Sequence, residues 1–370
     1  MTHLMTDLDT PYDPEWQPPV DTWLKRRLNA YIPEIDALAE AIIADFDEDS
    51  GGVRWWKDCL GEDARILISD YLYSLFEALS RSVLDAAVDL LELKAIWEPE
   101  SRRRNGYVLT ACESGATTLQ LPRPVSPAEE LPKARADIHL TDFFRAIGTG
   151  LDTLAGIVVG VTALPISIVK CDIEKVKRAL RANNRTSFQQ RFLDEFESAI
   201  QQAGPQGWLG YAVRYRNAMI HRARPLKFAI CVGEPSTLLD ARGRPIPSIK
   251  SSWVLPRAPE LTDAQAWRGS VGSWTLCEPA ELTLAGLLES FRSLLKAALP
   301  ALLVVWQERR ASPATHPQPH QQWPDLSEPP ASGFAGYAPE LRWGLSEGQQ
   351  VVSSPSLLTR MRAARVANRG

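Results

Sequence analysis

Two long stretches of the chain repeat their apolar residues at alternating intervals of four and three. The first covers residues 62–97, with Leu72, Phe76, Leu79, Val83, Ala86, Leu90, Leu93 and Trp97. The second begins near residue 138, with Leu140, Phe144, Ile147, Leu151, Leu154, Val158 and Val161. Such spacing is typical of helices that bury one face against neighbouring helices. It therefore predicts two long helices packed in a bundle.

Shorter segments continue the helical pattern. We expect helices over 33–46, 168–182, 188–202, 206–224 and 279–309. Thr186 and Gln189 have the spacing of a capping box before the helix at 188. Pro205 suits the start of the helix at 206 and Pro225 its end, while Pro300 is expected to kink or split the last helix.

Two regions favour strands instead. Residues 107–110 and 117–121 are β-prone and flank Glu113-Ser114-Gly115, which predicts a hairpin near 107–121 inserted between helices. A proline-bearing linker is expected to follow as far as Pro132. Segments 227–232, 249–255 and 271–277 predict a small sheet near 227–277. The expected fold is therefore mainly α, a helical bundle with small β insertions.

Composition suggests four regions along the 370 residues. Residues 1–20 carry Pro and Asp without periodicity and are expected to be disordered. Residues 21–60 form an N-terminal helical extension, and 61–310 form the bundle with its β insertions. Residues 311–370 are rich in Pro, Ser, Gln and Gly, so we expect a mostly disordered tail.

The overall composition narrows the classes of function. The net charge of −4 gives no global attraction to nucleic acid, so RNA binding would need a local basic patch. The five cysteines are far apart and lie at no zinc-ligand spacing from a histidine, which favours a reducing cytoplasm and no metal site. The start lacks an apolar secretory segment, and Asp152 interrupts the apolar run 146–164, so neither a secretory signal nor a membrane span is expected. Nucleotide-binding loops and common hydrolase motifs are missing, and no cofactor is expected.

One basic cluster stands out in residues 214–224. On a helix, Leu209, Val213, Arg216 and Ile220 would form one seam, which puts a guanidinium where an apolar side chain is expected. A cation there needs a carboxylate, a phosphate or a solvated cleft, because unpaired burial costs several kcal/mol. Asp152, beside the seam of the second long helix, is the candidate carboxylate, although it can equally be a surface residue.

The geometry of the cluster bears on how it could act. Asn217 and His221 are four apart and share one helical face. Arg216 and His221 are five apart, roughly 140° around the helix, so one helix alone cannot clamp a phosphate between them. A cleft or a second copy of the helix would be needed.

The run Arg216-Asn217-x-x-x-His221 resembles the R-(polar)-x-x-x-H form of the R-x4–6-H motif of the HEPN superfamily. The resemblance implies an all-helical domain that acts as a metal-independent endoribonuclease in toxin–antitoxin or antiviral defence. It also implies a homodimer whose two motifs form a composite site, and an antitoxin or defence complex as a partner.

In that interpretation RNA is cleaved by attack of a ribose 2′-OH on the adjacent phosphate. His221 would act as acid or base near its ordinary pKa of about 6.5. Arg216 would hold the phosphate oxygens and Asn217 would orient the phosphate or His221. Arg214, Arg222 and Arg224 would bind flanking phosphates. Tyr215 could stack on a base, although core packing has the greater weight.

Other interpretations stay open at the level of sequence. The cluster can be the solvated basic end of a helix, with His221 capping carbonyls. The bundle can be a non-catalytic module that binds RNA, a nucleotide or an acidic protein, or a purely structural bundle. His139 fits the start of a helix better than a catalytic role.

Overall fold

The computed structural model describes residues 20–46, 55–113, 126–182, 185–221, 228–234, 245, 248–256 and 277–312. Its helices are α1 (Val20–Arg27), α2 (Pro33–Phe46), α3 (Trp55–Glu113), α4 (Pro127–Thr162), α5 (Ile173–Leu180), α6 (Ser187–Ala203), α7 (Trp208–His221) and α9 (Ala280–Ala311). Its strands are β1 (Phe228–Glu234), β2 (Ser248–Pro256) and β3 (Cys277–Pro279). The prediction of a mainly α fold is confirmed.

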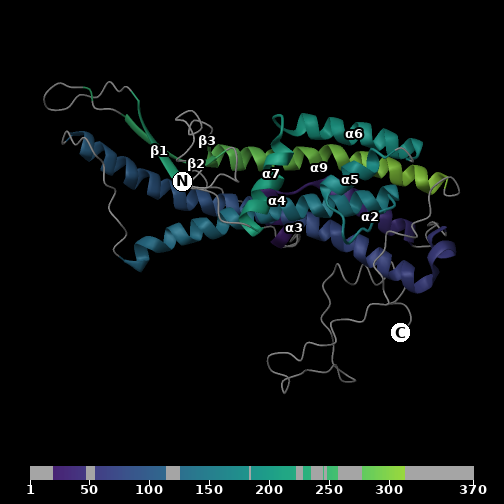
Figure 1. Cartoon of the computed structure of the whole chain (residues 1–370). Helices are drawn as coiled ribbons and strands as arrows, with labels where there is room; N and C mark the ends of the chain where they lie inside the picture. The colour runs from purple at the N-terminus through teal and green to yellow at the C-terminus, as the bar shows by residue number, and fades with distance from the viewer. Residues whose placement is uncertain are drawn as a thin grey trace, which may run out of the picture.

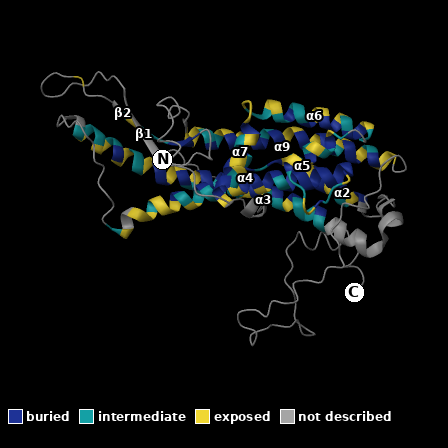
Figure 2. Ribbon diagram, viewed as in Figure 1, coloured by how far each residue is buried: buried dark blue, intermediate teal, exposed yellow. Residues whose placement is uncertain are grey.

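The core is built on the two long helices with the four–three pattern. Helices α3 and α4 lie side by side, and α9 packs against α2, α4 and α6 (Figure 1). The apolar seams of α3 and α4 face inward and are buried (Figure 2). Helix α2 shares this core, and the expected boundary at residue 60 falls inside α3, which begins at Trp55. Segments 21–60 and 61–310 are therefore packed as one unit in their described parts.

The hairpin expected near 107–121 is wrong over residues 107–113, because α3 continues through Pro99 to Glu113. Ion pairs between neighbouring turns support the helix there, with Arg102 2.5 Å from Glu98 and Arg103 2.9 Å from Glu100. Residues 114–121 lie outside the described part of the chain. The expected linker to Pro132 is also wrong from residue 127 on, because α4 begins at Pro127 and contains Pro132.

The small sheet near 227–277 is confirmed. It is antiparallel, in the order β1-β2-β3, with Phe228 opposite Val254 and Val254 opposite Pro279. The sheet lies at one end of the bundle, where β2 contacts α3 and α9 (Figure 1). The third strand is Cys277–Pro279, while residues 271–276 of the expected strand are outside the described chain.

Of two predictions made from local sequence, the one on the start of α6 is confirmed and the one on Pro300 in α9 is wrong. The capping box before α6 is confirmed: the Gln189 backbone N–H donates to Thr186 Oγ1, and the Thr186 backbone N–H donates to Gln189 Oε1. Pro300 does not split the last helix, since α9 is helical from Ala280 to Ala311. Burial of α9 against α2, α3, α4, α6 and α7 holds it together across the proline.

Helix α4 is also apolar enough to be considered as a membrane span. Within the described chain, the segment Glu130–Thr162 has sufficient length and hydropathy. In the protein 78% of its most apolar window is buried against other parts of the chain.

The C-terminal end of α4 is capped by a buried cation from α9. Arg309 is 1% exposed, and its Nη1 donates to the carbonyl oxygens of Gly160 at 3.1 Å and Val161 at 2.6 Å. These carbonyls lie in the last turn of α4, where a positive charge also complements the helix dipole. Burial lowers the pKa of Arg309 to about 9, so the guanidinium still carries its charge at neutral pH.

We expect Arg309→Met to lower the free energy of unfolding by about 2–3 kcal/mol, because two buried carbonyls lose a charged donor. Urea unfolding followed by circular dichroism measures this. Arg181→Met is the matched control: Arg181 pairs with Glu197 on the surface, where such a pair contributes less than about 1 kcal/mol. Equal stability of Arg309→Met and the native chain would contradict the capping role.

Candidate functional site

Helix α7 carries the basic cluster and buries a different face from the one expected. Ile220 is 40% exposed, whereas the buried residues of α7 are Trp208, Leu209, Ala212, Tyr215, Ala218 and Met219. The expected seam is therefore wrong at Ile220, while Val213 and Arg216 are partly buried and Val213 packs against the core. The helix is rotated so that Tyr215 enters the core and Arg216 lies at its edge.

Tyr215 is a core residue, which confirms the favoured expectation of core packing and makes the alternative, stacking on an RNA base, wrong. Its side chain is 0% exposed, and its ring stacks on Phe144 with 4.7 Å between centroids. Its hydroxyl donates to the carbonyl oxygen of Pro256 at 2.5 Å. This bond joins α7 to the end of β2 and satisfies a phenol that has no access to water.

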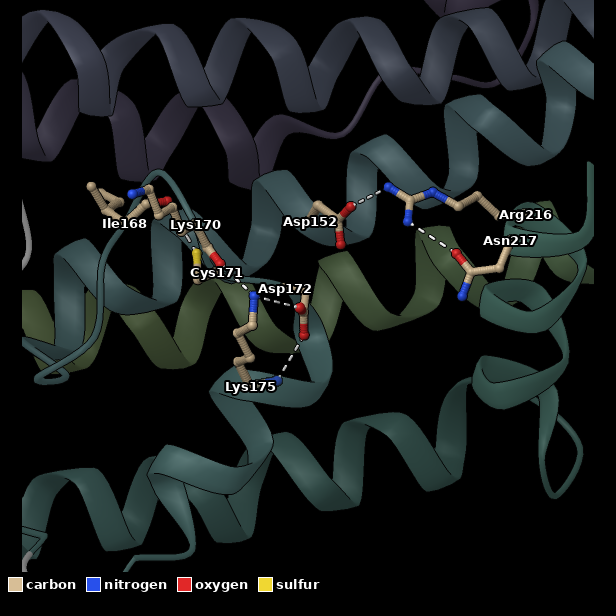
Figure 3. A network of polar contacts seen from close by, with 8 residues as sticks. All are labelled: Asp152, Ile168, Lys170, Cys171, Asp172, Lys175, Arg216 and Asn217. Carbon is tan, nitrogen blue, oxygen red and sulfur yellow. Dashed lines mark hydrogen bonds and ion pairs between the residues drawn. The ribbon is translucent and has the colours of Figure 1, made fainter. Parts of the chain in front are cut away.

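The predicted pairing of Arg216 with Asp152 is confirmed (Figure 3). Arg216 Nη2 lies 2.6 Å from Asp152 Oδ2, and Arg216 Nη1 donates to Asn217 Oδ1 at 3.2 Å. The pair is only partly buried, with the side chains of Arg216 and Asp152 27% and 33% exposed. The structure thus brings together three predicted site residues, two from α7 and one from α4, at a position that solvent can reach.

Gly148 on α4 makes room for the stem of Arg216. A Cβ atom at residue 148 would lie 2.5 Å from Arg216 Cγ and 3.0 Å from its Nε. Arg216 Nε is itself buried and has no hydrogen-bond partner among the described residues. The guanidinium is therefore held by its two Nη atoms, and its position depends on close approach of α7 to α4.

A second group of polar residues lies near Asp152 at the start of α5 (Figure 3). Asp172 caps this helix by accepting from the Lys175 backbone N–H at 2.8 Å, and Lys175 Nζ lies 3.1 Å from the same carboxylate. Burial raises the pKa of the Cys171 thiol to about 11, so it is protonated at neutral pH. Cys171 is therefore not an activated nucleophile.

The charge state of Asp152 is set by opposing effects. Burial raises its pKa above the ordinary value of 3.8, and the negative charge of Asp172 acts in the same direction. The positive charge of Arg216 and its hydrogen bond lower the pKa. Asp152 and Arg216 are thus linked: each changes the cost of keeping the other charged.

Of the remaining predicted site residues, the structure describes the side chain of Arg214 alone. Arg214 is exposed on α7, one turn before Asn217. His221 is the last residue of α7, but its side chain is outside the described part, as are Arg222 and Arg224. Their roles stay predictions.

A pair that the sequence did not indicate lies between α3 and α4. His139 Nδ1 is 2.9 Å from Asp89 Oδ1. Asp89 also lines a pocket of about 310 Å³, together with Asp85, Asp142 and Arg145. Burial raises the pKa of Asp89, and the hydrogen bond from His139 opposes this. The two residues are 50 positions apart, so only the pairing of the two long seams could have suggested their contact.

Among the described residues, no group of three or more His, Cys, Asp or Glu side chains is arranged to hold a metal ion. What the α4–α7 site offers is a fixed, partly exposed guanidinium, an adjacent amide and a carboxylate. Such a group can bind an anion or an acidic side chain if that ligand competes with Asp152.

No family model, curated protein or solved structure matches this chain.

We expect Gly148→Ala to lower the free energy of unfolding by about 1–2 kcal/mol. Alanine favours helices by up to about 1 kcal/mol over glycine, but overpacking against Arg216 costs about 1–3 kcal/mol. Gly210→Ala on α7 is the control, because a Cβ there meets no atom within 4 Å. Urea unfolding should show opposite signs for the two variants; stabilisation by both would show that Arg216 is not confined by residue 148.

We expect Arg216→Gln to raise the pKa of Asp152, because the positive charge that lowers it is removed. Carboxyl carbon shifts in protein labelled at aspartate measure the titration. A pKa above the unfolded value means that the folded state binds the proton more tightly. The contribution of Asp152 to stability therefore falls as pH rises from about 3.8 through the folded pKa. An unchanged Asp152 titration in the variant would contradict the linkage.

Proposed function

We propose that this protein is a metal-independent endoribonuclease that cleaves RNA by attack of the 2′-OH on the adjacent phosphate. The observation that supports this best is the placement of Arg216. It is partly exposed and held by Asp152 and Asn217 on the helix that ends at His221. The resemblance of this run to the HEPN motif supplies the reaction type.

Arg216 is the group proposed to bind the scissile phosphate. A guanidinium fixed before the substrate arrives loses little entropy on binding and stabilises charge that develops on the phosphate oxygens. Asp152 holds it in place, and Gly148 lets its stem lie close to α4. Removing a comparable stabilising group typically costs about 3–4 kcal/mol in transition-state energy.

Asn217 and His221 are proposed to complete the chemistry. They are four residues apart on α7, and His221 lies at the helix end, where a side chain can reach a ligand beyond the last turn. His221 would take the proton of the 2′-OH or give one to the leaving 5′-oxygen. Such a proton transfer typically raises the reaction rate by about 10²–10⁴-fold. Arg214, Arg222 and Arg224 would bind neighbouring phosphates.

A homodimer is part of the proposal, because a single motif histidine, His221, cannot comfortably serve as both acid and base. Helix α7 packs mainly on α4, and Gly210, Arg214 and Ile220 on it are exposed. A second copy of α7 against this face would place two motifs together. The cytoplasmic setting, the role in toxin–antitoxin or antiviral defence and an antitoxin or defence-complex partner are proposed from the HEPN resemblance.

A non-catalytic binding module is the second candidate, and the Asp152 contact favours it. At 2.6 Å, the carboxylate already neutralises Arg216, so RNA phosphate must compete with an internal partner. A protein or RNA held through the exposed polar edge of the site, without cleavage, fits this arrangement as well. The two candidates differ in whether incubated RNA changes.

We expect the purified protein to cleave RNA in the presence of EDTA and to leave 2′,3′-cyclic phosphate ends. His221→Ala should lower the rate by about 10²-fold or more, because the proton transfer is lost. Denaturing gels and mass spectrometry of the products measure the cleavage, and circular dichroism verifies that the variant is folded.

His139→Ala is the matched control, because His139 pairs with Asp89 away from α7. It should retain cleavage. Loss of activity in His139→Ala but not in His221→Ala would move the active site to the pocket between α3 and α4. RNA binding without cleavage by the native protein would favour the binding module.

A further inference from the structure

Helix α5 and the segment before it carry a local excess of positive charge. Residues 170–181 contain five Lys or Arg and two Asp or Glu, a net charge of +3, whereas the whole chain carries −4. Four of the five cations are exposed, and we call them the α5 basic surface: Lys170, Lys175, Arg178 and Arg181. The overall composition does not account for such a cluster, since it is acidic.

The bundle fixes the direction in which this surface faces. Helix α5 packs against α4 and α6, and its apolar residues are at most 2% exposed: Ile173, Val176 and Leu180. The cations at 175, 178 and 181 follow at intervals of three on the opposite side of the helix. Six residues of helix rise about 9 Å, so these cations form a row of about that length on a fixed support.

Two cations of this row are not neutralised within the protein. Lys175 and Arg181 each have a carboxylate within 3.1 Å. The side chains of Lys170 and Arg178 form no ion pair or hydrogen bond with any residue that the structure describes. By contrast, the exposed arginines of α3 are each paired with a carboxylate one turn along the helix: Arg81, Arg102 and Arg103.

The α5 basic surface begins next to the pair of Arg216 and Asp152 (Figure 3). Lys175 Nζ donates to the Lys170 carbonyl oxygen at 2.7 Å, so both residues lie at the start of α5. Burial has the largest effect on the pKa of Asp152, and the positive charge of Lys175 is among the smaller effects that lower it. Lys175 is thus close to that carboxylate, and a polyanion that contacts Arg216 can continue along α5.

We propose that the α5 basic surface binds the phosphate backbone of single-stranded RNA on one side of Arg216. Lysine and arginine bind phosphates without reading the bases, so this contact adds affinity and orientation but no sequence preference. The choice of RNA rests on the proposed function, whereas the binding itself does not require cleavage at α7.

Two other polyanionic partners fit this surface less well. A helix that binds a lipid surface inserts its apolar face, but that face of α5 is buried in the bundle. The centre of a protein interface is usually aromatic or apolar, whereas the exposed residues of α5 are all charged: Glu174, Lys175 and Arg178. A flexible strand of phosphates needs neither an apolar face nor an apolar centre.

The test is fluorescence anisotropy of the full chain with a labelled single-stranded 2′-O-methyl RNA, at about 50 to 200 mM KCl. This RNA lacks the attacking hydroxyl and is not cleaved by it. In the double variant Lys170→Gln/Arg178→Gln, the slope of log K against log [KCl] should fall in magnitude by about 1.4. Each contact with a phosphate of a single strand contributes about 0.7 to that slope, so affinity at about 0.1 M KCl should fall roughly 25-fold.

The matched control is Lys133→Gln/Arg135→Gln, which removes one lysine and one arginine from the exposed face of α4. Residue 133 precedes Asp152 by 19 positions on one helix, which is about 28 Å. Charges at that distance are screened at about 0.1 M salt, so this variant should keep the native slope and affinity. Circular dichroism verifies that both double variants are folded.

Equal slopes in the native protein and Lys170→Gln/Arg178→Gln would overturn the proposal. The same loss in both double variants would also overturn it, because the effect would then come from net charge alone. Poly-L-glutamate and vesicles containing phosphatidylserine are tested in parallel. Binding of either one through Lys170 and Arg178, without binding of RNA, would replace RNA by an acidic protein or a membrane.

Failure of this proposal and failure of the proposed function are observed separately. A native protein that cleaves RNA, while both double variants bind RNA equally well, would keep the ribonuclease and reject the α5 basic surface. Binding that depends on Lys170 and Arg178, with no cleavage of ordinary RNA, would keep the surface and reject the ribonuclease. Absence of RNA binding by the native protein at about 50 mM KCl would overturn the proposed surface.

Discussion

Helix α4 is enclosed by α3, α5, α7 and α9, and this enclosure constrains the rest of the structure. A helix surrounded in this way has little room for side chains of its own, and glycine at four of its positions (148, 150, 156 and 160) lets neighbours approach. Gly150 admits Phe291 of α9, and Gly148 admits the stem of Arg216. The same enclosure partly desolvates Asp152, which raises the free-energy cost of its negative charge. The positive charge of Arg216 offsets part of that cost. The candidate site is thus a product of how tightly the core helix is covered.

The features that the sequence could predict are those that depend on neighbouring positions. Apolar spacing located both long helices, because their seams repeat over many turns and only one face can be buried. The capping box at Thr186 depends on residues three apart. The pairing of Asp152 with Arg216 could also be predicted from the sequence. A guanidinium at the edge of the core needs a counter-charge, and few carboxylates lie beside the seams.

The features that it could not predict depend on contacts between distant residues. Residues 107–113 are β-prone by composition, but strand preference depends on what a segment packs against, and here it extends α3. Core packing of Tyr215 was the favoured expectation, but its partners, Phe144 and the Pro256 carbonyl, are far away in the chain and could not be predicted. The contact of His139 with Asp89 similarly required the register of α3 against α4.

The cap that Arg309 provides has a consequence for synthesis on the ribosome. The carbonyls of Gly160 and Val161 precede their donor by 149 and 148 residues. At about 5–20 residues per second, roughly 7–30 s pass between translation of the end of α4 and that of Arg309. During this interval the last turn of α4 must remain hydrated or frayed, so a helix of the core is among the last to be completed. A nascent chain stalled before residue 309 would therefore expose apolar surface and depend on chaperones.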